Sequence, residues 1–343
     1  MSRPSHALAR AILLALCLAL LAATGLAACG EKEERLSPKG ASRFELLLDY
    51  FPNADHAGIY AARAGGDFRE VGLDVEIRQP ADPAAPIKQV AAGRVDLAIS
   101  YEPEVLRARD KGLPVVSVGA LVQKPLTSII SLPAARIRRP ADLKGKTVGT
   151  AGIDYQSAYL QTILLHAGVD PGEVKERNVG FNLVPALITK KVDAILGGFW
   201  NYEGVDLRQR GRRPRIIRME RAGVPSYNEL VLVANERALD RKGPRIRAFI
   251  GALARGTAEL RRNPDQAIDG LLRANRDLDR KLQLASVRAT LPLFFPPSGK
   301  PFGYQDPRAW RSFAEWMRDN ELVGRLPDAS RVFTNDYLPG AGL

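Results

Sequence analysis

Two stretches of this sequence repeat one pattern. Residues 93–102 and 190–203 each place a basic residue before Val-Asp, continue with an apolar run, and end in aromatic residues and a glutamate. In open α/β sheets, ligands bind beyond the carboxyl ends of the strands. The repeat therefore predicts two equivalent strands in two α/β lobes, whose ends meet at one shared cleft. The alternative is a chance likeness, because short buried runs resemble one another.

Short apolar runs alternate with helical stretches from Phe44 onward. This alternation is typical of parallel strands joined by helical crossovers, so we expect an α/β fold. Beyond residue 234 helices dominate. The expected strands are 44–48, 73–77, 95–99, 115–118, 146–149, 174–179, 192–196, 215–219 and 230–234, and the expected helices are 56–70, 86–92, 103–111, 155–167 and 183–189.

The N-terminal segment has the features of a lipoprotein signal. Arg3 and Arg10 precede an uncharged Ala/Leu run, and the sequence Leu-Ala-Ala-Cys at residues 26–29 fits a lipobox. We expect residues 1–28 to be a signal peptide and the thiol of Cys29 to carry the lipid. The alternative is a transmembrane anchor, because residues 11–30 carry no charge and about 20 apolar residues span a bilayer.

The mature chain is expected to begin with a polar, flexible tether over residues 29–42. It would lie in the periplasm or on the cell surface, anchored to a membrane by lipid. Without residues 1–28, the 343-residue chain is still long for one hydrophobic core, which favours two lobes.

Residue counts exclude several kinds of chemistry. Cys17 lies in the signal and Cys29 would be lipidated, so neither of the two cysteines is left for catalysis, a disulfide or a metal. Only His56 and His166 survive processing, which excludes a His-rich metal site. The net charge is +12, but the arginines are scattered and the densest group is residues 208–215, so we expect no nucleic-acid partner.

Aromatic and acidic residues gather where expected strands end. Aromatic faces favour a flat conjugated ligand, and carboxylates accept hydrogen bonds from amino groups or pair with a cation. The combination suits an aminopyrimidine or a cationic amine better than a sulfonate or a phosphate. Ordinary semi-buried packing of the aromatic residues is the alternative. The groups are Asp49-Tyr50-Phe51 with Asn53, then Tyr101-Glu102, and Trp200-Asn201-Tyr202-Glu203.

No catalytic constellation stands out. Ser100 has no histidine partner visible in the sequence, and Glu102 and Glu104 lie at an expected helix start, where the helix dipole favours acids. His56 is as plausible a structural hydrogen-bonding residue as a ligand contact.

Four motifs resemble those of the ThiY-type (SsuA/THI5-like, NMT1) substrate-binding proteins of ABC importers for thiamine pyrimidine precursors. The resemblance runs from about Phe44 to Leu338. It implies a two-lobed type II periplasmic-binding-protein fold that binds a formylaminopyrimidine or hydroxymethylpyrimidine and presents it to a permease. The motifs are residues 49–58 (DYFPNADHAG), 183–187 (LVPAL), 197–201 (GGFWN) and 334–338 (TNDYL).

The resemblance also implies where the lobes and the site lie. Lobe 1 would span residues 43–128 plus 233–343 and lobe 2 residues 129–232, with hinge crossings near 127–132 and 230–235. Members of this family usually carry Trp where Tyr50 stands and Gln where Glu102 stands. The expected ligand-binding residues are Asp49, Tyr50, Asn53, His56, Tyr101, Glu102, Asp154, Trp200, Asn201, Glu203 and Tyr227.

The same superfamily includes fungal hydroxymethylpyrimidine phosphate synthases. These enzymes are similar around Val95-Asp96 but carry a lysine for pyridoxal phosphate where Ser100 stands, a histidine where Glu104 stands, and a cysteine cluster near Tyr227. We therefore expect a monomeric binding protein, with no enzymatic activity, no cofactor and no metal. A binding protein for riboflavin, a sulfonate such as taurine, or nitrate is the first alternative, and a synthase-like enzyme the second.

Overall fold

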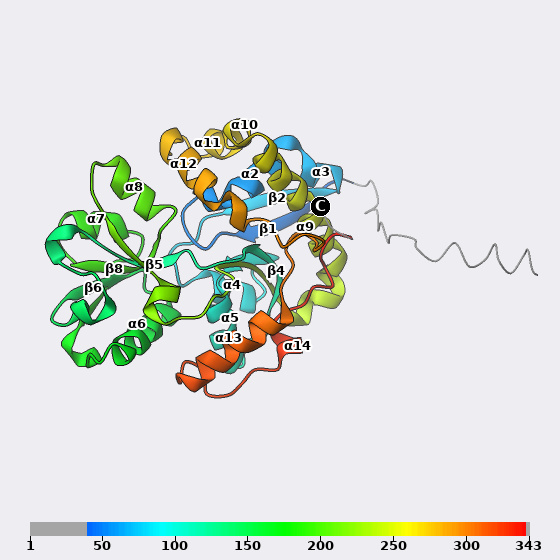
Figure 1. The fold of residues 1–343 in the computed structure, drawn as a ribbon. Coiled ribbons are helices and arrows are strands. Elements are labelled where there is room, and N and C mark those ends of the chain that lie inside the picture. Colours follow the sequence, from blue (N-terminus) through cyan, green and yellow to red (C-terminus); the bar gives the residue numbers. More distant parts are fainter. Residues whose placement is uncertain (1–39, 341–343) are drawn as a thin grey trace, which may run out of the picture. The chain divides into compact units, whose positions relative to one another are not determined.

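The computed structural model describes residues 40–340 (Figure 1). The expected signal peptide, Cys29 and nearly all of the expected tether lie outside these residues, so they stay predictions. Within residues 40–340 no helix is long and apolar enough to cross a membrane.

The described chain forms two five-stranded sheets with helices packed against them. We call the first sheet and its helices lobe 1, and the second sheet and its helices lobe 2. Lobe 1 holds the strands in the order β2 (Leu73–Arg78), β1 (Ser42–Leu47), β3 (Leu97–Ser100), β10 (Leu230–Asn235) and β4 (Val115–Val122). Lobe 2 holds β7 (Lys175–Asn178), β6 (Thr147–Thr150), β8 (Ala194–Phe199), β5 (Thr127–Ser131) and β9 (Arg215–Arg218).

The helices follow the same division, and Figure 1 shows those of lobe 2 in green. Lobe 2 carries α6 (Asp154–His166), α7 (Leu183–Ile188) and α8 (Glu203–Gln209). Lobe 1 carries the short η1 (Ala54–His56), then α2 (Ala57–Gly65), α3 (Asp67–Glu70), α4 (Pro86–Ala91), α5 (Glu102–Asp110), α9 (Leu239–Arg262), α10 (Pro264–Ala267), α11 (Asp269–Ala274), α12 (Arg280–Thr290), α13 (Pro307–Asp319) and α14 (Ala329–Val332).

Most strands are parallel, as the alternation of strands and helices predicts, but one strand in each sheet is not. β10 runs antiparallel to β3 and β4, and β5 runs antiparallel to β8 and β9. These are the strands that follow the two crossings between lobes. Each of them enters its sheet from a strand of the other sheet, β4 before β5 and β9 before β10, and not through a helical crossover within its own sheet. The expectation of parallel strands is therefore wrong for β10.

The lobe boundaries inferred from the sequence stay a prediction. The boundary after residue 128 falls within β5, and the boundary before residue 233 falls within β10. The expected hinge crossings thus coincide with regular strands. β5 itself was not among the strands expected from the sequence.

The repeated pattern occupies equivalent places in the two sheets. β3 and β8 are each the third strand of their sheet, so the predicted equivalence is confirmed. The Val-Asp step has a structural role, because Asp96 accepts a hydrogen bond from the backbone N–H of Glu45 in β1 (2.8 Å). Asp193 accepts one from Thr147 in β6 (2.8 Å) in the same way. Each aspartate therefore ties the start of a central strand to its neighbour.

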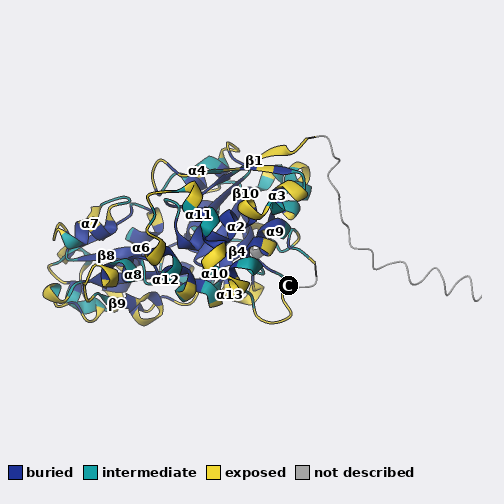
Figure 2. Ribbon diagram, turned by 90° about the horizontal axis from the view of Figure 1, so that it is seen from above, coloured by how far each residue is buried: buried dark blue, intermediate teal, exposed yellow. Residues whose placement is uncertain are grey.

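The core of lobe 1 packs the long helix α9 against α2. Phe249 stacks between Phe44 and Phe68, with ring centroids 5.0 and 4.9 Å away. Gly256 permits the close approach of the two helices, because a Cβ there would lie 2.4 Å from the backbone nitrogen of Ala62. In Figure 2 the buried residues follow these central elements, and exposed residues cover their outer sides.

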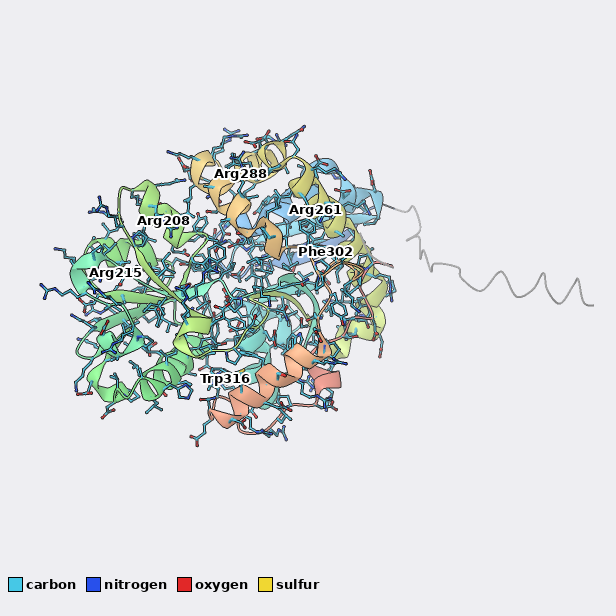
Figure 3. All side chains as sticks on the ribbon, in the orientation of Figure 1. Arg208, Arg215, Arg261, Arg288, Phe302 and Trp316 are labelled. Carbon is cyan, nitrogen blue, oxygen red and sulfur yellow. The ribbon has the colours of Figure 1, made fainter. Side chains whose placement is uncertain are left out.

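The arginines do not form a single stripe. Arg208 and Arg215 lie on lobe 2, whereas Arg261 and Arg288 lie on α9 and α12 of lobe 1 (Figure 3). This spread agrees with the scattered charge pattern of the sequence.

Candidate functional site

A cavity is lined by residues of both lobes. Its walls combine aromatic rings, aliphatic side chains and two carboxyl groups. The lining comprises Asp49, Tyr50, Asn53 and Tyr101 of lobe 1, and Ala151, Ile153, Tyr155, Gln156, Leu183, Gly197, Phe199, Tyr202 and Glu203 of lobe 2. Five residues expected from the sequence are among them: Asp49, Tyr50, Asn53, Tyr101 and Glu203.

Asp49 is held by two donors from lobe 1. Tyr101 donates from its hydroxyl to Asp49 Oδ2 (2.7 Å), and His56 Nε2 lies 2.8 Å from Asp49 Oδ1. The backbone N–H of Asn53 donates to His56 Nδ1 (3.2 Å), which makes Nε2 the nitrogen that carries the proton toward Asp49. His56 therefore orients Asp49 and is not itself among the residues that line the cavity.

The loop that presents Asp49 is fixed by local capping. Asn53 caps η1, since its side-chain oxygen accepts from the backbone N–H of Asp55 (2.8 Å). The reciprocal bond to His56 completes a capping box, which satisfies donors that a helix start leaves unpaired. The motif at residues 49–58 thus folds into a rigid corner after β1.

Glu203 brings the second carboxyl to the cavity from the start of α8. Its Oε2 accepts from the backbone N–H of Phe199 (2.7 Å). Burial raises the pKa of Glu203 to about 8, against the lowering effect of that bond. Below about pH 8 the group is therefore neutral and can donate one hydrogen bond and accept another.

Aromatic rings from both lobes surround these acids. Tyr101 and Tyr155 approach across the lobes with ring centroids 5.4 Å apart. Tyr50 packs edge-on against Phe181 (4.8 Å), and its buried hydroxyl has no hydrogen-bond partner among the described residues. Burial, followed by the charge of Glu203, raises the pKa of Tyr50, so this hydroxyl stays protonated as a donor.

Two expected ligand residues lie at the crossings between the lobes instead of on the cavity lining. Glu102 Oε2 accepts from the backbone N–H and from Nδ2 of Asn228, both at 2.7 Å. Tyr227 packs against Phe313 (5.0 Å) and donates to Glu229 (3.3 Å). Both side chains turn toward the crossing that enters β10.

Two further expected residues have other partners. Trp200 donates from Nε1 to the carbonyl of Pro125 (3.1 Å), and the guanidinium of Arg218 lies 4.1 Å from the centroid of its ring. Asp154 faces lobe 1, where Arg107 Nε (3.0 Å) and Lys111 Nζ (2.6 Å) contact its carboxylate. Asn201 also faces lobe 1, through contacts described below. Ligand-binding roles for residues away from the lining stay predictions.

Sequence reasoning did not single out several residues that line the cavity, among them Tyr155 and Gln156. A signal was present for Gln156, because Gly197 opposite it has φ +103° and a Cβ there would lie 2.3 Å from Gln156 Nε2. Gln156 Oε1 accepts from the backbone N–H of Ala151 (2.8 Å), which fixes the start of α6 against the end of β6. Gly197 thus makes room for the side chain of Gln156.

Ser100 and Glu104 form a buried pair in lobe 1. The hydroxyl of Ser100 donates to Glu104 Oε2 (2.5 Å), and burial raises the pKa of Glu104 to about 7. Neither residue is among those that line the cavity. Where the fungal synthases are expected to carry a lysine and a histidine, this chain carries a self-contained hydrogen-bonded pair.

Comparisons with known proteins agree with this architecture. A family model described as "NMT1/THI5 like" matches residues 53–267. The formylaminopyrimidine-binding protein of Halalkalibacterium halodurans is 36% identical over 92% of this chain and 96% of its own length. The 4-amino-5-hydroxymethyl-2-methylpyrimidine phosphate synthase of Legionella pneumophila is 27% identical over 87% of this chain and 93% of its own length.

Among solved structures, the alkanesulfonate-binding protein SsuA of Xanthomonas axonopodis pv. citri, bound to MOPS, has a TM-score of 0.67. It is 18% identical and covers 86% of this chain and 99% of its own, a likeness that establishes the fold alone.

The two lobes and the cavity between them define a protein with the periplasmic-binding-protein fold, and the fold and relatives support a solute-binding role. The chain belongs to the NMT1/THI5-like family.

Proposed function

We propose that this protein is an extracytoplasmic solute-binding lipoprotein of an ABC importer that binds a thiamine pyrimidine precursor in the cavity between its lobes. The ligand would be a formylaminopyrimidine or a hydroxymethylpyrimidine. The observation that carries the proposal is that Asp49 of lobe 1 and Glu203 of lobe 2 line the same aromatic-walled cavity. The name of the formylaminopyrimidine-binding relative supports it.

The protonation of Glu203 suits an aminopyrimidine. Such a ring offers an amino group, which donates, beside a ring nitrogen, which accepts. A neutral carboxyl offers the complementary pair, because its O–H donates and its carbonyl oxygen accepts. With a pKa raised to about 8, Glu203 is neutral at pH 7 and meets this requirement. The aromatic rings of the wall, which meet one another tilted or edge-on, would hold the flat faces of the pyrimidine.

The cavity does not suit an anion. None of the described residues that line it is Lys or Arg, whereas two are acids. Helices α6, α7 and α8 begin at or beside lining residues and offer backbone amides, but no cationic side chain of the described lining accompanies them, so the acids disfavour a sulfonate or nitrate. We therefore propose a different ligand class from that of the sulfonate-binding proteins that share the fold.

The lobes would close over the ligand by a hinge at the two crossings. Glu229, before β10, accepts from the backbone N–H groups of Leu126 (2.6 Å) and Thr127 (2.7 Å), before and at the start of β5. This carboxyl ties one crossing to the other, so the pair can bend as a unit. The closed form would then dock on a permease, and lipid on Cys29 would hold the protein at the membrane.

The proposal is tested by identifying the molecule that the purified protein retains, using native mass spectrometry. An aminopyrimidine mass supports it, and a retained sulfonate, flavin or other anion contradicts it. The anchor is tested separately: Cys29→Ala should release the protein from membranes or block its processing. A variant that fractionates with membranes as wild type does would remove the lipoprotein assignment.

A further inference from the structure

A buried cluster of hydrogen bonds joins the two lobes at one point outside the cavity lining. Asn201, at the end of β8 in lobe 2, donates from Nδ2 to Asp55 Oδ1 (2.7 Å) and to Thr290 Oγ1 (2.5 Å), both in lobe 1. Thr290 is also 3.2 Å from Asp55 Oδ1, which closes the triangle. Asn201 and Thr290 are fully buried, and Asp55 is 5% exposed.

The residue after Asn201 reinforces the same connection. Tyr202 accepts a hydrogen bond at its hydroxyl from Gln283 Nε2 (3.1 Å), and Gln283 lies on α12 of lobe 1. Tyr202 lines the cavity, and Glu203 follows it. Three consecutive residues therefore perform two tasks, with Asn201 facing lobe 1, Glu203 facing the cavity, and Tyr202 reaching both.

We propose that Asp55, Asn201 and Thr290 form a latch that holds the two lobes together over an occupied cavity. None of the three is among the residues that line the cavity. The latch therefore acts on the closed form itself and does not discriminate between ligands. This inference rests on the proposed binding function, because it assumes that the lobes close on a solute.

Unpartnered polar atoms around the latch favour its opening. Four buried polar atoms around it have no hydrogen-bond partner among the described residues: Asp55 Oδ2, Asn201 Oδ1, Gln283 Oε1 and Ser286 Oγ. When the lobes separate, water reaches such atoms and satisfies them, so closure removes hydrogen bonds as well as forming them. The two effects offset each other, and the ligand can then decide the balance between open and closed forms.

A second connection between the lobes provides a matched control. Asp154 of lobe 2 contacts Arg107 Nε (3.0 Å) and Lys111 Nζ (2.6 Å) of lobe 1, but its side chain is 52% exposed. Exposed ion pairs contribute little to stability, because water and salt screen them. Asp154→Asn should therefore change closure much less than a substitution in the buried latch.

The test exchanges the two partners of the central hydrogen bond. Asn201→Asp alone places two carboxyl groups together and should weaken binding of 4-amino-5-hydroxymethyl-2-methylpyrimidine by roughly 10- to 100-fold, mainly through faster dissociation. Adding Asp55→Asn restores one carboxyl and one amide, and should recover most of the lost affinity. The affinity ratio between this ligand and its 4-oxo counterpart should stay as in wild type for every latch variant.

Thr290→Val keeps the shape of the side chain and should cause a smaller loss of affinity than Asn201→Asp. This variant provides the test if Asn201→Asp does not fold. If the folded latch variants kept the affinity and dissociation rate of wild type, the latch proposal would be overturned. A changed ratio between the two ligands, or a double variant that folds but regains nothing, would overturn it as well. If wild type binds neither pyrimidine, the proposed function fails, and the latch is tested on the protein with whichever solute it retains through purification. In small-angle scattering of that occupied form, folded Asn201→Asp must be more extended than wild type, and equal dimensions would overturn the latch.

Discussion

The corners that follow β3 and β8 share one sequence pattern and one place in their sheets, but their glutamates do different things. Glu102 begins α5 and accepts two hydrogen bonds from Asn228 at a crossing between the lobes. Glu203 begins α8, accepts from the backbone of its own corner, and lines the cavity. Burial raises the pKa of each to about 8. The repeated pattern thus builds equivalent corners, and the segment packed against each corner decides what its acid contacts.

Replacing each glutamate by methionine should produce the largest measurable difference between the two corners. Glu203→Met removes a donor and an acceptor from the cavity, which we expect to cost about 1.5–3 kcal/mol of aminopyrimidine binding. That corresponds to a loss of roughly 10- to 150-fold in affinity, measurable by calorimetry. Glu102→Met should leave affinity unchanged.

Stability should respond in the opposite order. Glu102→Met leaves the backbone N–H and the amide of Asn228 without their acceptor, which costs about 1–3 kcal/mol and lowers the melting temperature by several degrees. Glu203→Met should change the melting temperature less. If both variants lost affinity equally, the two corners would not have separate tasks.

Affinity should depend on pH through Glu203. The group is protonated below about pH 8, and the complementary pairing with an aminopyrimidine needs that proton. Binding should therefore be steady near pH 7 and weaken as the pH rises above about 8. Glu203→Gln keeps a donor and an acceptor without a titrating proton, so its affinity should stay constant across the same range. An equal decline in wild type and Glu203→Gln would assign the titration to another group.

Stability should depend on pH through Glu102. A carboxyl whose pKa is raised on folding stabilises the native state fully below its unfolded pKa of 4.5, and this contribution is lost as the pH rises toward the folded value of about 8. The wild-type melting temperature should therefore fall between pH 5 and pH 9. Glu102→Gln should make this fall smaller, while an unchanged slope would show that Glu102 does not titrate in this range.

The smallest effect is expected at Tyr50. Its buried hydroxyl has no partner among the described residues, so Tyr50→Phe should leave stability unchanged or slightly raise it. If the hydroxyl donates to an oxygen of the ligand, the variant should bind 4-amino-5-hydroxymethyl-2-methylpyrimidine about three- to tenfold more weakly, at about 1 kcal/mol per neutral hydrogen bond. The analogue that carries a methyl in place of the hydroxymethyl group should bind both proteins alike, and calorimetry with the two ligands separates the outcomes.

The sequence predicted much of this architecture because strand ends are marked by a change from apolar to polar residues. It predicted the equivalence of β3 and β8, and it predicted that Asp49 and Glu203 lie near one cleft. It did not predict that β5 and β10 run antiparallel, since the direction of a strand depends on the lobe from which the chain arrives. No apolar pattern records that direction.

The directions of side chains within a corner were the main feature of the site that the sequence did not predict. Residues 200–203 were treated as one ligand-binding group, yet Trp200 packs on Arg218, Asn201 bonds to lobe 1, and Glu203 lines the cavity. Consecutive residues of a turn point in different directions, and backbone angles that a composition pattern does not encode set those directions. Tyr155 was missed for a related reason, because its partner Tyr101 belongs to the other lobe.

The central claim is that the cavity between the lobes recognises an amino group on a flat pyrimidine. A calorimetric titration of wild type at pH 7 with 4-amino-5-hydroxymethyl-2-methylpyrimidine and with its 4-oxo counterpart tests this claim most directly. We predict that the amino ligand binds at least about tenfold more tightly, the effect of one unmatched hydrogen-bond pair. Equal binding of the two ligands, or no binding of the amino ligand, would contradict the account.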